Sequence, residues 1–78
     1  MQVRVTLYTI LKSYGSGKIG RDGCLVLPEN ATLQGLADHL EIPRNMGKVF
    51  LVDGSPRREE WALRGGEEVQ IFAFIGGG

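Results

Sequence analysis

The fold of this chain is decided by residues 68–75, EVQIFAFI, in which two sets of side chains alternate. Alternation with period two predicts a β-strand that turns one face toward a core. The face predicted to be buried holds Val69, Ile71, Ala73 and Ile75. The other face holds Gln70, Phe72 and Phe74. We expect this strand to lie in the middle of a sheet.

Three further strands are predicted upstream of this segment. Residues 3–11 alternate in the same way and are rich in β-branched side chains. Residues 24–27 form a short apolar run that Pro28 ends, because proline has no N–H to give to a sheet. The segment KVFLV, residues 48–52, is followed by Asp53-Gly54, a strong signal for a tight turn.

One helix is predicted, beginning after the N-cap candidate Thr32 and ending before Pro43. Its apolar residues recur at helical spacing and form one stripe. The stripe consists of Leu33, Leu36, Ala37 and Leu40. Residues 12–23 are rich in glycine and predict the loop of a loose hairpin, and residues 55–64 are expected to be irregular.

The order strand, strand, helix, strand, strand predicts an α+β fold. The architecture that suits it best is the β-grasp (ubiquitin-like) arrangement, a mixed sheet of four to five strands with one main helix packed on one face. The last strand would lie parallel to the first, at its side. We expect residues 1–75 to form this domain and residues 76–78 to form a flexible tail.

Composition excludes several classes of function. A chain of 78 residues makes one domain, and its formal net charge of zero argues against a nucleic-acid binder. No apolar run approaches the roughly 20 residues that cross a bilayer, and no secretory signal pattern is present, so no membrane contact is expected. The single cysteine, Cys24, rules out an internal disulfide. A reducing compartment, the cytoplasm, is expected.

No catalytic constellation is visible. His39 is the only histidine and falls on the flank of the predicted helix, where a solvated side chain is expected. Cys24 is expected to be a small buried apolar residue, since no basic neighbour would activate its thiol. The segment Gly15-Ser16-Gly17-Lys18 lacks the spacing of a phosphate-binding loop and no helix follows it. We therefore predict neither catalytic residues nor a metal site.

The glycines Gly76, Gly77 and Gly78 are the most unusual feature. They cannot serve packing, because glycine has no side chain to bury and loses the most entropy on ordering. They are either an inert tail or the reactive end of a protein substrate. Residues without Cβ could thread a narrow channel, and three extended residues reach about 10 Å. The second interpretation makes the carboxylate of Gly78 the group that an enzyme modifies.

The outward aromatic residues of the last strand support this interpretation. Phe72 and Phe74 would lie on the uncovered face of the sheet, next to the tail. Aromatic side chains are enriched at protein interfaces, so we predict that both, with Ile75, dock a partner. The alternative is that residues 12–23 or the segment around Trp61 cover these rings.

The chain resembles the ThiS/MoaD family of β-grasp sulfur carriers, which is related to ubiquitin. The resemblance covers nearly the whole chain and is most specific in its last third. Asp53-Gly54, PRREEW at 56–61 and LRGGEEV at 63–69 are similar to the thiamine branch, ThiS. The ending FIGGG at 74–78 also looks like that of ThiS, without the two prolines common in the molybdopterin branch, MoaD. Residues 12–23 are longer than in most ThiS chains and look more like MoaD.

The resemblance implies a carrier rather than an enzyme. An E1-like adenylyltransferase would use Mg·ATP to adenylate Gly78, and a persulfide sulfur donor would convert it to a thiocarboxylate. Thiazole synthase would accept the sulfur in the thiamine branch. The large subunit of molybdopterin synthase would accept it in the molybdenum or tungsten branch. No stably bound cofactor is expected.

Three alternatives stay open beside the thiamine carrier. The first is the molybdopterin or tungstopterin branch. The second is a ubiquitin-like modifier, in which Gly78 would join a lysine amine instead of accepting sulfur. The third is a binding module with an inert tail.

Overall fold

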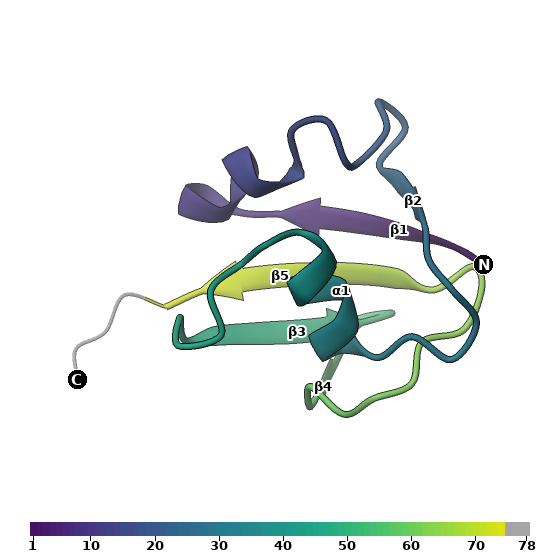
Figure 1. Cartoon of the computed structure of the whole chain (residues 1–78). Coiled ribbons are helices and arrows are strands. Elements are labelled where there is room, and N and C mark those ends of the chain that lie inside the picture. Colours follow the sequence, from purple (N-terminus) through teal and green to yellow (C-terminus); the bar gives the residue numbers. More distant parts are fainter. Residues whose placement is uncertain (75–78) are drawn as a thin grey trace.

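Five strands form one mixed sheet in the computed structural model, which describes residues 1–74 (Figure 1). The strands are β1 (Gln2–Leu7), β2 (Cys24–Val26), β3 (Lys48–Val52), β4 (Ser55–Arg57) and β5 (Glu68–Ala73). Their order across the sheet is β2-β1-β5-β3-β4. The central pair, β1 and β5, is parallel, and the other neighbours are antiparallel. The predicted α+β class and the central place of the last strand are confirmed.

The hairpin between β3 and β4 contains a strand that the sequence did not predict. Asp53 and Gly54 have φ angles of 49° and 86°, as a two-residue turn of type I′ requires. This turn brings Val52 opposite Ser55 and starts β4 inside a segment that we had expected to be irregular. Proline is tolerated at Pro56 because β4 lies at the edge of the sheet.

The helix α1 (Leu33–His39) begins where the sequence predicts. The Thr32 hydroxyl accepts a hydrogen bond from the backbone N–H of Gly35 at 3.1 Å and so caps the first turn. The apolar stripe faces the sheet and is at most 1% exposed. Its members are Leu33, Leu36, Ala37 and Leu40. The helix therefore gains its stability from packing rather than from its two turns of backbone hydrogen bonds.

The first strand is shorter than predicted. β1 ends at Leu7, and the rest of the predicted strand belongs to a 3₁₀ helix, η1 (Thr9–Gly15). The chain turns at Thr9, whose φ of 51° takes it out of the extended region. Leu11 belongs to this helix and its side chain is fully buried. The apolar pattern therefore predicted its burial correctly but its strand conformation wrongly.

The second strand buries a different side chain from the one that the sequence predicts. β2 ends at Val26, one residue earlier than predicted, and Leu25 is its buried member. Cys24 is half-buried, so the prediction of a buried cysteine was wrong. The reason is register: Cys24 pairs with Arg4, whose side chain lies on the face of the sheet turned away from the helix.

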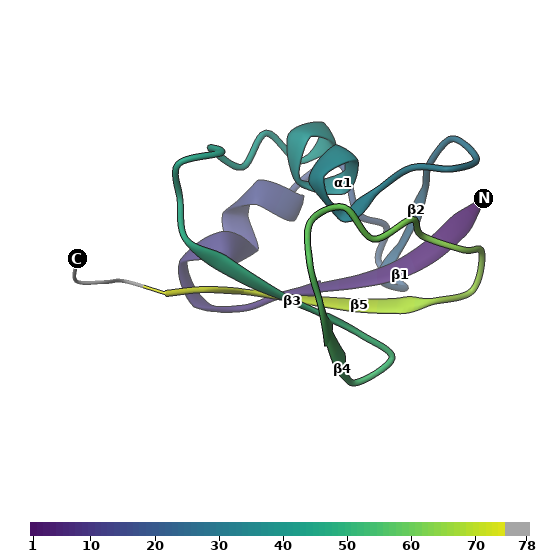
Figure 2. The same ribbon diagram turned by 90° about the horizontal axis from the view of Figure 1, so that it is seen from below.

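The long segment between β1 and β2 is fastened to the rest of the domain. The ammonium group of Lys18 forms an ion pair with Glu41 and donates a hydrogen bond to the backbone oxygen of His39 at 3.1 Å. The backbone N–H of Val5 bonds to the oxygen of Gly23 at 2.8 Å. The 3₁₀ helix and α1 lie on the same side of the sheet (Figure 2).

One hydrophobic core fills the space between the sheet and these helices. Inward residues of the strands meet the apolar stripe of α1, with Leu11, Ile42 and Leu63 closing the margins. The strand members are Val3, Val5, Leu7, Leu25, Phe50, Val52, Val69 and Ile71. Among the described residues, none of the helices has the length and apolarity needed to cross a bilayer.

Replacing the helix cap gives a direct test of this local account. Thr32→Ala should lower the free energy of unfolding by about 1 kcal/mol, because the N–H of Gly35 loses its acceptor. Thr32→Ser keeps the hydroxyl and should stay close to the parent. Urea denaturation measures both. Equal stabilities of the alanine and serine variants would contradict the capping role.

Two exposed carboxylates should make the stability depend on pH. Hydrogen bonds from Arg44 lower the pKa of Asp38, and a hydrogen bond from Lys18 lowers the pKa of Glu41. A lowered pKa in the folded state means that the unfolded chain binds the proton more readily. The stabilisation is therefore present at neutral pH and is lost as the pH falls below about 4.

The measurement is the urea midpoint at neutral and at acid pH. The double variant Asp38→Asn, Glu41→Gln should show a smaller drop on acidification than the parent. An identical drop would mean that other groups control the acid sensitivity.

Candidate functional site: the open sheet face beside the carboxyl end

The face of the sheet opposite α1 and η1 carries an apolar patch at one end. The register places Val49 beside Phe72 and Leu51 beside Gln70. Tyr8 follows Leu7, which pairs with Ile71, so Tyr8 comes next to Phe72. We call Tyr8, Val49, Leu51, Phe72 and Phe74 the open-face patch. Val49 and Phe74 are among the exposed large apolar residues of the described chain. The patch lies where β5 ends and the carboxyl end begins.

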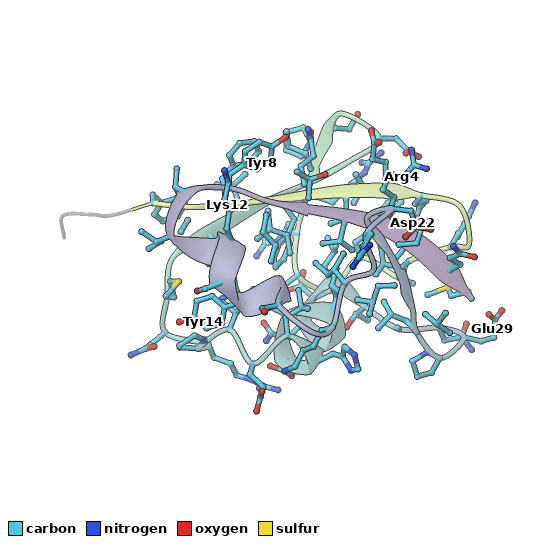
Figure 3. The ribbon with its side chains drawn as sticks, turned by 90° about the horizontal axis from the view of Figure 1, so that it is seen from above. Arg4, Tyr8, Lys12, Tyr14, Asp22 and Glu29 are labelled. Carbon is cyan, nitrogen blue, oxygen red and sulfur yellow. The ribbon has the colours of Figure 1, made fainter. Side chains whose placement is uncertain are left out.

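A stacked aromatic pair forms the centre of the patch. The rings of Tyr8 and Phe72 are parallel to within 6°, with their centroids 4.4 Å apart. The amide Nε2 of Gln70 donates a hydrogen bond to the Tyr8 hydroxyl at 2.8 Å. Tyr8 lies on the face of the sheet away from η1 (Figure 3). Stacking and the hydrogen bond together hold the Tyr8 ring in one orientation.

The second phenylalanine rests on a glycine. The backbone N–H of Phe74 bonds to the oxygen of Gly47 at 3.1 Å, which continues the sheet pattern one residue past β5. A Cβ placed on Gly47 would clash with the Phe74 ring, so only glycine allows the ring this close. Phe74 is nevertheless 58% exposed. Its outer face is therefore available to a partner.

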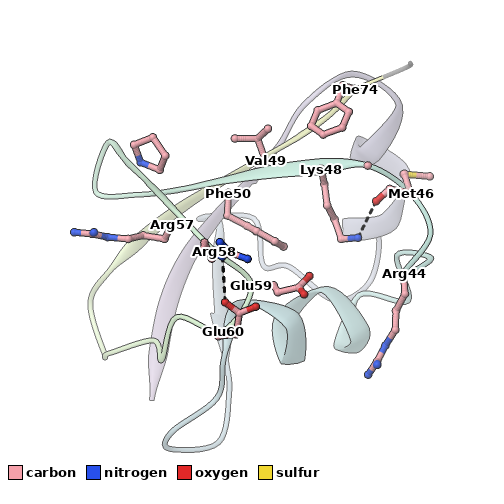
Figure 4. Close-up of a pocket in the computed structure, with 12 residues that line it drawn as sticks. Arg44, Met46, Lys48, Val49, Phe50, Arg57, Arg58, Glu59, Glu60 and Phe74 are labelled. Carbon is pink, nitrogen blue, oxygen red and sulfur yellow. Dashed lines mark hydrogen bonds and ion pairs between the residues drawn. The ribbon is translucent and has the colours of Figure 1, made fainter. Parts of the chain in front are cut away.

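A groove of mixed charge runs along the outer edge of β3, beside the patch (Figure 4). The Lys48 ammonium donates to the backbone oxygen of Met46 at 3.0 Å, and Arg58 pairs with Glu60 at 3.5 Å. Farther along, the guanidinium of Arg57 lies 4.2 Å from the centre of the Trp61 ring. These charges lie along one edge of the sheet, and the apolar residues Val49 and Phe74 line the same groove.

The acidic, histidine and cysteine side chains of residues 1–74 are dispersed. Among residues 1–74, no group of three or more histidine, cysteine, aspartate or glutamate side chains is gathered as a metal ion would require. His39 is exposed on α1, as expected, and lies on the opposite side of the sheet from the patch.

The structure brings two of the predicted docking residues together and does not describe the rest. Phe72 and Phe74 both lie on the outward face, as the alternation predicts. Phe74 is exposed, whereas Phe72 is half-buried. The ring that covers Phe72 belongs to Tyr8, and not to residues 12–23 or to Trp61 as the alternative prediction had it. Ile75 and the glycines 76–78 lie outside the described residues.

Sequence reasoning missed three members of the patch. Tyr8 was placed inside the first predicted strand, and its outward parity was available from the alternation with Leu7. Val49 and Leu51 alternate with Phe50 in the same way. What the sequence could not supply was the register, which decides that Tyr8 and Val49 flank Phe72 rather than a different residue.

The fold has a counterpart among solved structures. The crystal structure of SAMP1 from Haloferax volcanii matches with a TM-score of 0.68 over the whole length of both chains, at 16% sequence identity. At this identity, the likeness establishes the fold alone, which is the β-grasp. No curated protein matches the sequence of this chain.

The sequence itself identifies the class. The profile of the ThiS family matches residues 18–78, which is most of the chain. The chain belongs to the ThiS family. It is accordingly a ubiquitin-like sulfur carrier, a protein substrate rather than an enzyme, and its partner is an E1-like activating enzyme. Carriers of this family bind no cofactor of their own.

Truncating each phenylalanine should lower the free energy of unfolding by different amounts, because Phe72 is packed against Tyr8 and Phe74 is exposed. Phe72→Ala should destabilise the fold by about 1–2 kcal/mol, because the Tyr8 ring loses its stacking partner. Phe74→Ala should change stability by no more than about 0.5 kcal/mol, since most of its ring already faces solvent. Urea unfolding of both variants checks this order. A larger loss at Phe74 would show that its contact with Gly47 supports the sheet.

Proposed function

We propose that the chain carries sulfur as a thiocarboxylate on Gly78 for the thiazole ring of thiamine. The observation that carries this proposal is the reach of the ThiS family match, which extends to Gly78 and includes the glycines before it. The segment PRREEW at 56–61 and the proline-free ending FIGGG at 74–78 support the thiamine branch over its relatives.

The proposed chemistry takes place on the partner enzyme. A carboxylate oxygen of Gly78 attacks the α-phosphorus of ATP, and pyrophosphate leaves with Mg²⁺. The terminal sulfur of a donor persulfide then attacks the carbonyl carbon of this acyl-adenylate, and AMP leaves. A second thiol attacks the donor-side sulfur of the resulting acyl disulfide. That step forms a disulfide between the two thiols and releases the thiocarboxylate of Gly78.

The proposed division of labour assigns recognition and reaction to different parts of the chain. Residues 1–75 form the domain that partners recognise, and residues 76–78 form the tail that reacts. Phe72, Phe74 and Ile75 are the proposed docking residues. Four residues follow Phe74, and an extended segment of that length spans about 14 Å. An enzyme that holds Gly78 must therefore lie close to the open-face patch.

The remaining partners follow from this pathway. We propose a persulfide sulfur donor and thiazole synthase as the acceptor, with Mg·ATP bound by the activating enzyme rather than by the carrier. We place the protein in the cytoplasm, with no nucleic-acid or membrane partner. The formal net charge of zero supports the absence of a nucleic-acid partner.

One observation favours a second candidate, the molybdenum or tungsten cofactor branch. The connection between β1 and β2 is long and contains the 3₁₀ helix η1, whereas the thiamine branch typically has a tight hairpin there. In this alternative the large subunit of molybdopterin synthase accepts the sulfur. The chemistry at Gly78 is the same in both branches.

Mass spectrometry of the intact protein tests the carrier role. After incubation with an E1-like adenylyltransferase, Mg·ATP and a persulfide donor, the mass should rise by the difference between sulfur and oxygen, and fragmentation should map the change to Gly78. A chain extended beyond Gly78 should show no change and should remain folded. A thiocarboxylate located elsewhere, or none while a control carrier is converted, would contradict the proposal.

The branch is then decided by sulfur transfer. The thiocarboxylated chain is offered separately to thiazole synthase and to the large subunit of molybdopterin synthase. Loss of sulfur from Gly78 to the first alone supports the thiamine assignment. Transfer to the second alone supports the alternative, and conjugates of Gly78 with lysines of other proteins would indicate a modifier.

A further inference from the structure

The hydroxyl of Tyr8 carries a hydrogen that the domain itself does not use. Its oxygen accepts the hydrogen bond from Gln70 Nε2 at 2.8 Å. Among residues 1–74, no oxygen or nitrogen accepts a hydrogen bond from this hydroxyl. A phenol is both a donor and an acceptor, so half of its hydrogen-bonding capacity is left for a group outside the domain. With Nε2 turned toward the phenol, Gln70 acts as the donor and leaves the phenol hydrogen to such a group.

The hydroxyl is held in place rather than free to turn away. The ring of Tyr8 is stacked on Phe72, and its backbone N–H bonds to the oxygen of Ile71 at 3.3 Å. Its backbone oxygen accepts from the N–H of Leu11 at 3.0 Å and from the Thr9 hydroxyl at 2.8 Å. The backbone bonds hold the main chain from which the side chain projects, and stacking on Phe72 with the bond from Gln70 orients the ring. This order before binding lowers the entropic cost of binding.

The hydroxyl lies on the open face of the sheet, beside Gln70 and Phe72. Tyr8 neighbours Phe72 on the patch, and Phe74 is the last residue before the four that end in Gly78. A surface that extends from Phe74 over Phe72 to Gln70 excludes water from the Tyr8 hydroxyl as well. A buried donor without an acceptor is costly, so a partner that fits must supply one.

We propose that Tyr8 determines partner specificity by donating its hydroxyl hydrogen to an oxygen of the activating enzyme, a backbone carbonyl or a carboxylate. This inference rests on the proposed docking of that enzyme to the open-face patch. The apolar members of the patch accept many surfaces, whereas the Tyr8 donor rejects those without an acceptor in this place. Tyr8 is thus a recognition residue and takes no part in the chemistry at Gly78.

The test is Tyr8→Phe, which keeps the stacked ring and removes only the hydroxyl. The dissociation constant for the E1-like adenylyltransferase that activates this chain should rise about tenfold. The KM for the carrier in pyrophosphate release should rise similarly while kcat stays unchanged. Tyr14→Phe is the matched control, because Tyr14 lies on η1, on the other side of the sheet, and its loss of a hydroxyl should leave both constants unchanged.

The outcomes separate this inference from the proposed function. Parent-like affinity of Tyr8→Phe with weak binding of Phe74→Ala would overturn the role of Tyr8 and leave the docking surface intact. Parent-like affinity of both variants would overturn the docking surface itself. Binding is measured well below the unfolding temperature of each variant, so that lost stability does not imitate lost affinity.

Discussion

The parallel pairing of β1 with β5 is the constraint on which the rest of the structure depends. Val5 lies beside Val69 and Leu7 beside Ile71, and all four side chains point into the core. Two parallel strands run in the same direction, so their carboxyl ends lie side by side at the same end of the sheet. The residue after β1 is Tyr8, and it therefore lies beside Phe72, near the end of β5. The aromatic pair of Tyr8 and Phe72 is a direct consequence of this register.

The strict alternation of the central strands separates the residues of the core from those of the open face. Inward residues such as Val69 and Ile71 are fully buried beneath α1, whereas Gln70 and Phe72 lie on the open face, where Phe72 belongs to the patch. A change of register by one residue would exchange these two sets. The alternation within β5 thus assigns its residues either to the core or to the open face. A carrier needs no catalytic side chain, because the partner supplies the chemistry and the carrier supplies a surface and a chain end.

The sequence predicted those parts of the fold whose signals are local. The stripe from Leu33 to Leu40, the cap at Thr32 and the turn at Asp53-Gly54 depend on neighbouring residues, and the structure confirms all of them. The course of the chain after Leu7 depends on distant contacts. Leu11 is apolar and fits a strand as well as a 3₁₀ helix, so the pattern could not show the turn at Thr9.

The same distinction applies to the candidate site. Phe74 could be predicted as exposed, because β-strand parity is a local property. The cover that Tyr8 places on Phe72 comes from residues that are far apart in the sequence, and the hydrogen bond from Gln70 follows from the same pairing. The short strand β4 escaped prediction because Pro56 argues against a strand unless the strand is known to lie at an edge.

The central claim is that the open face beside the carboxyl end is the surface that the activating enzyme recognises. Nuclear magnetic resonance of the nitrogen-15-labelled chain during titration with that enzyme tests the claim most directly. The account predicts that backbone signals of Tyr8, Val49, Leu51, Phe72 and Phe74 shift or broaden first, while those of α1 stay in place. Changes concentrated on α1, with the open face unaffected, would contradict it.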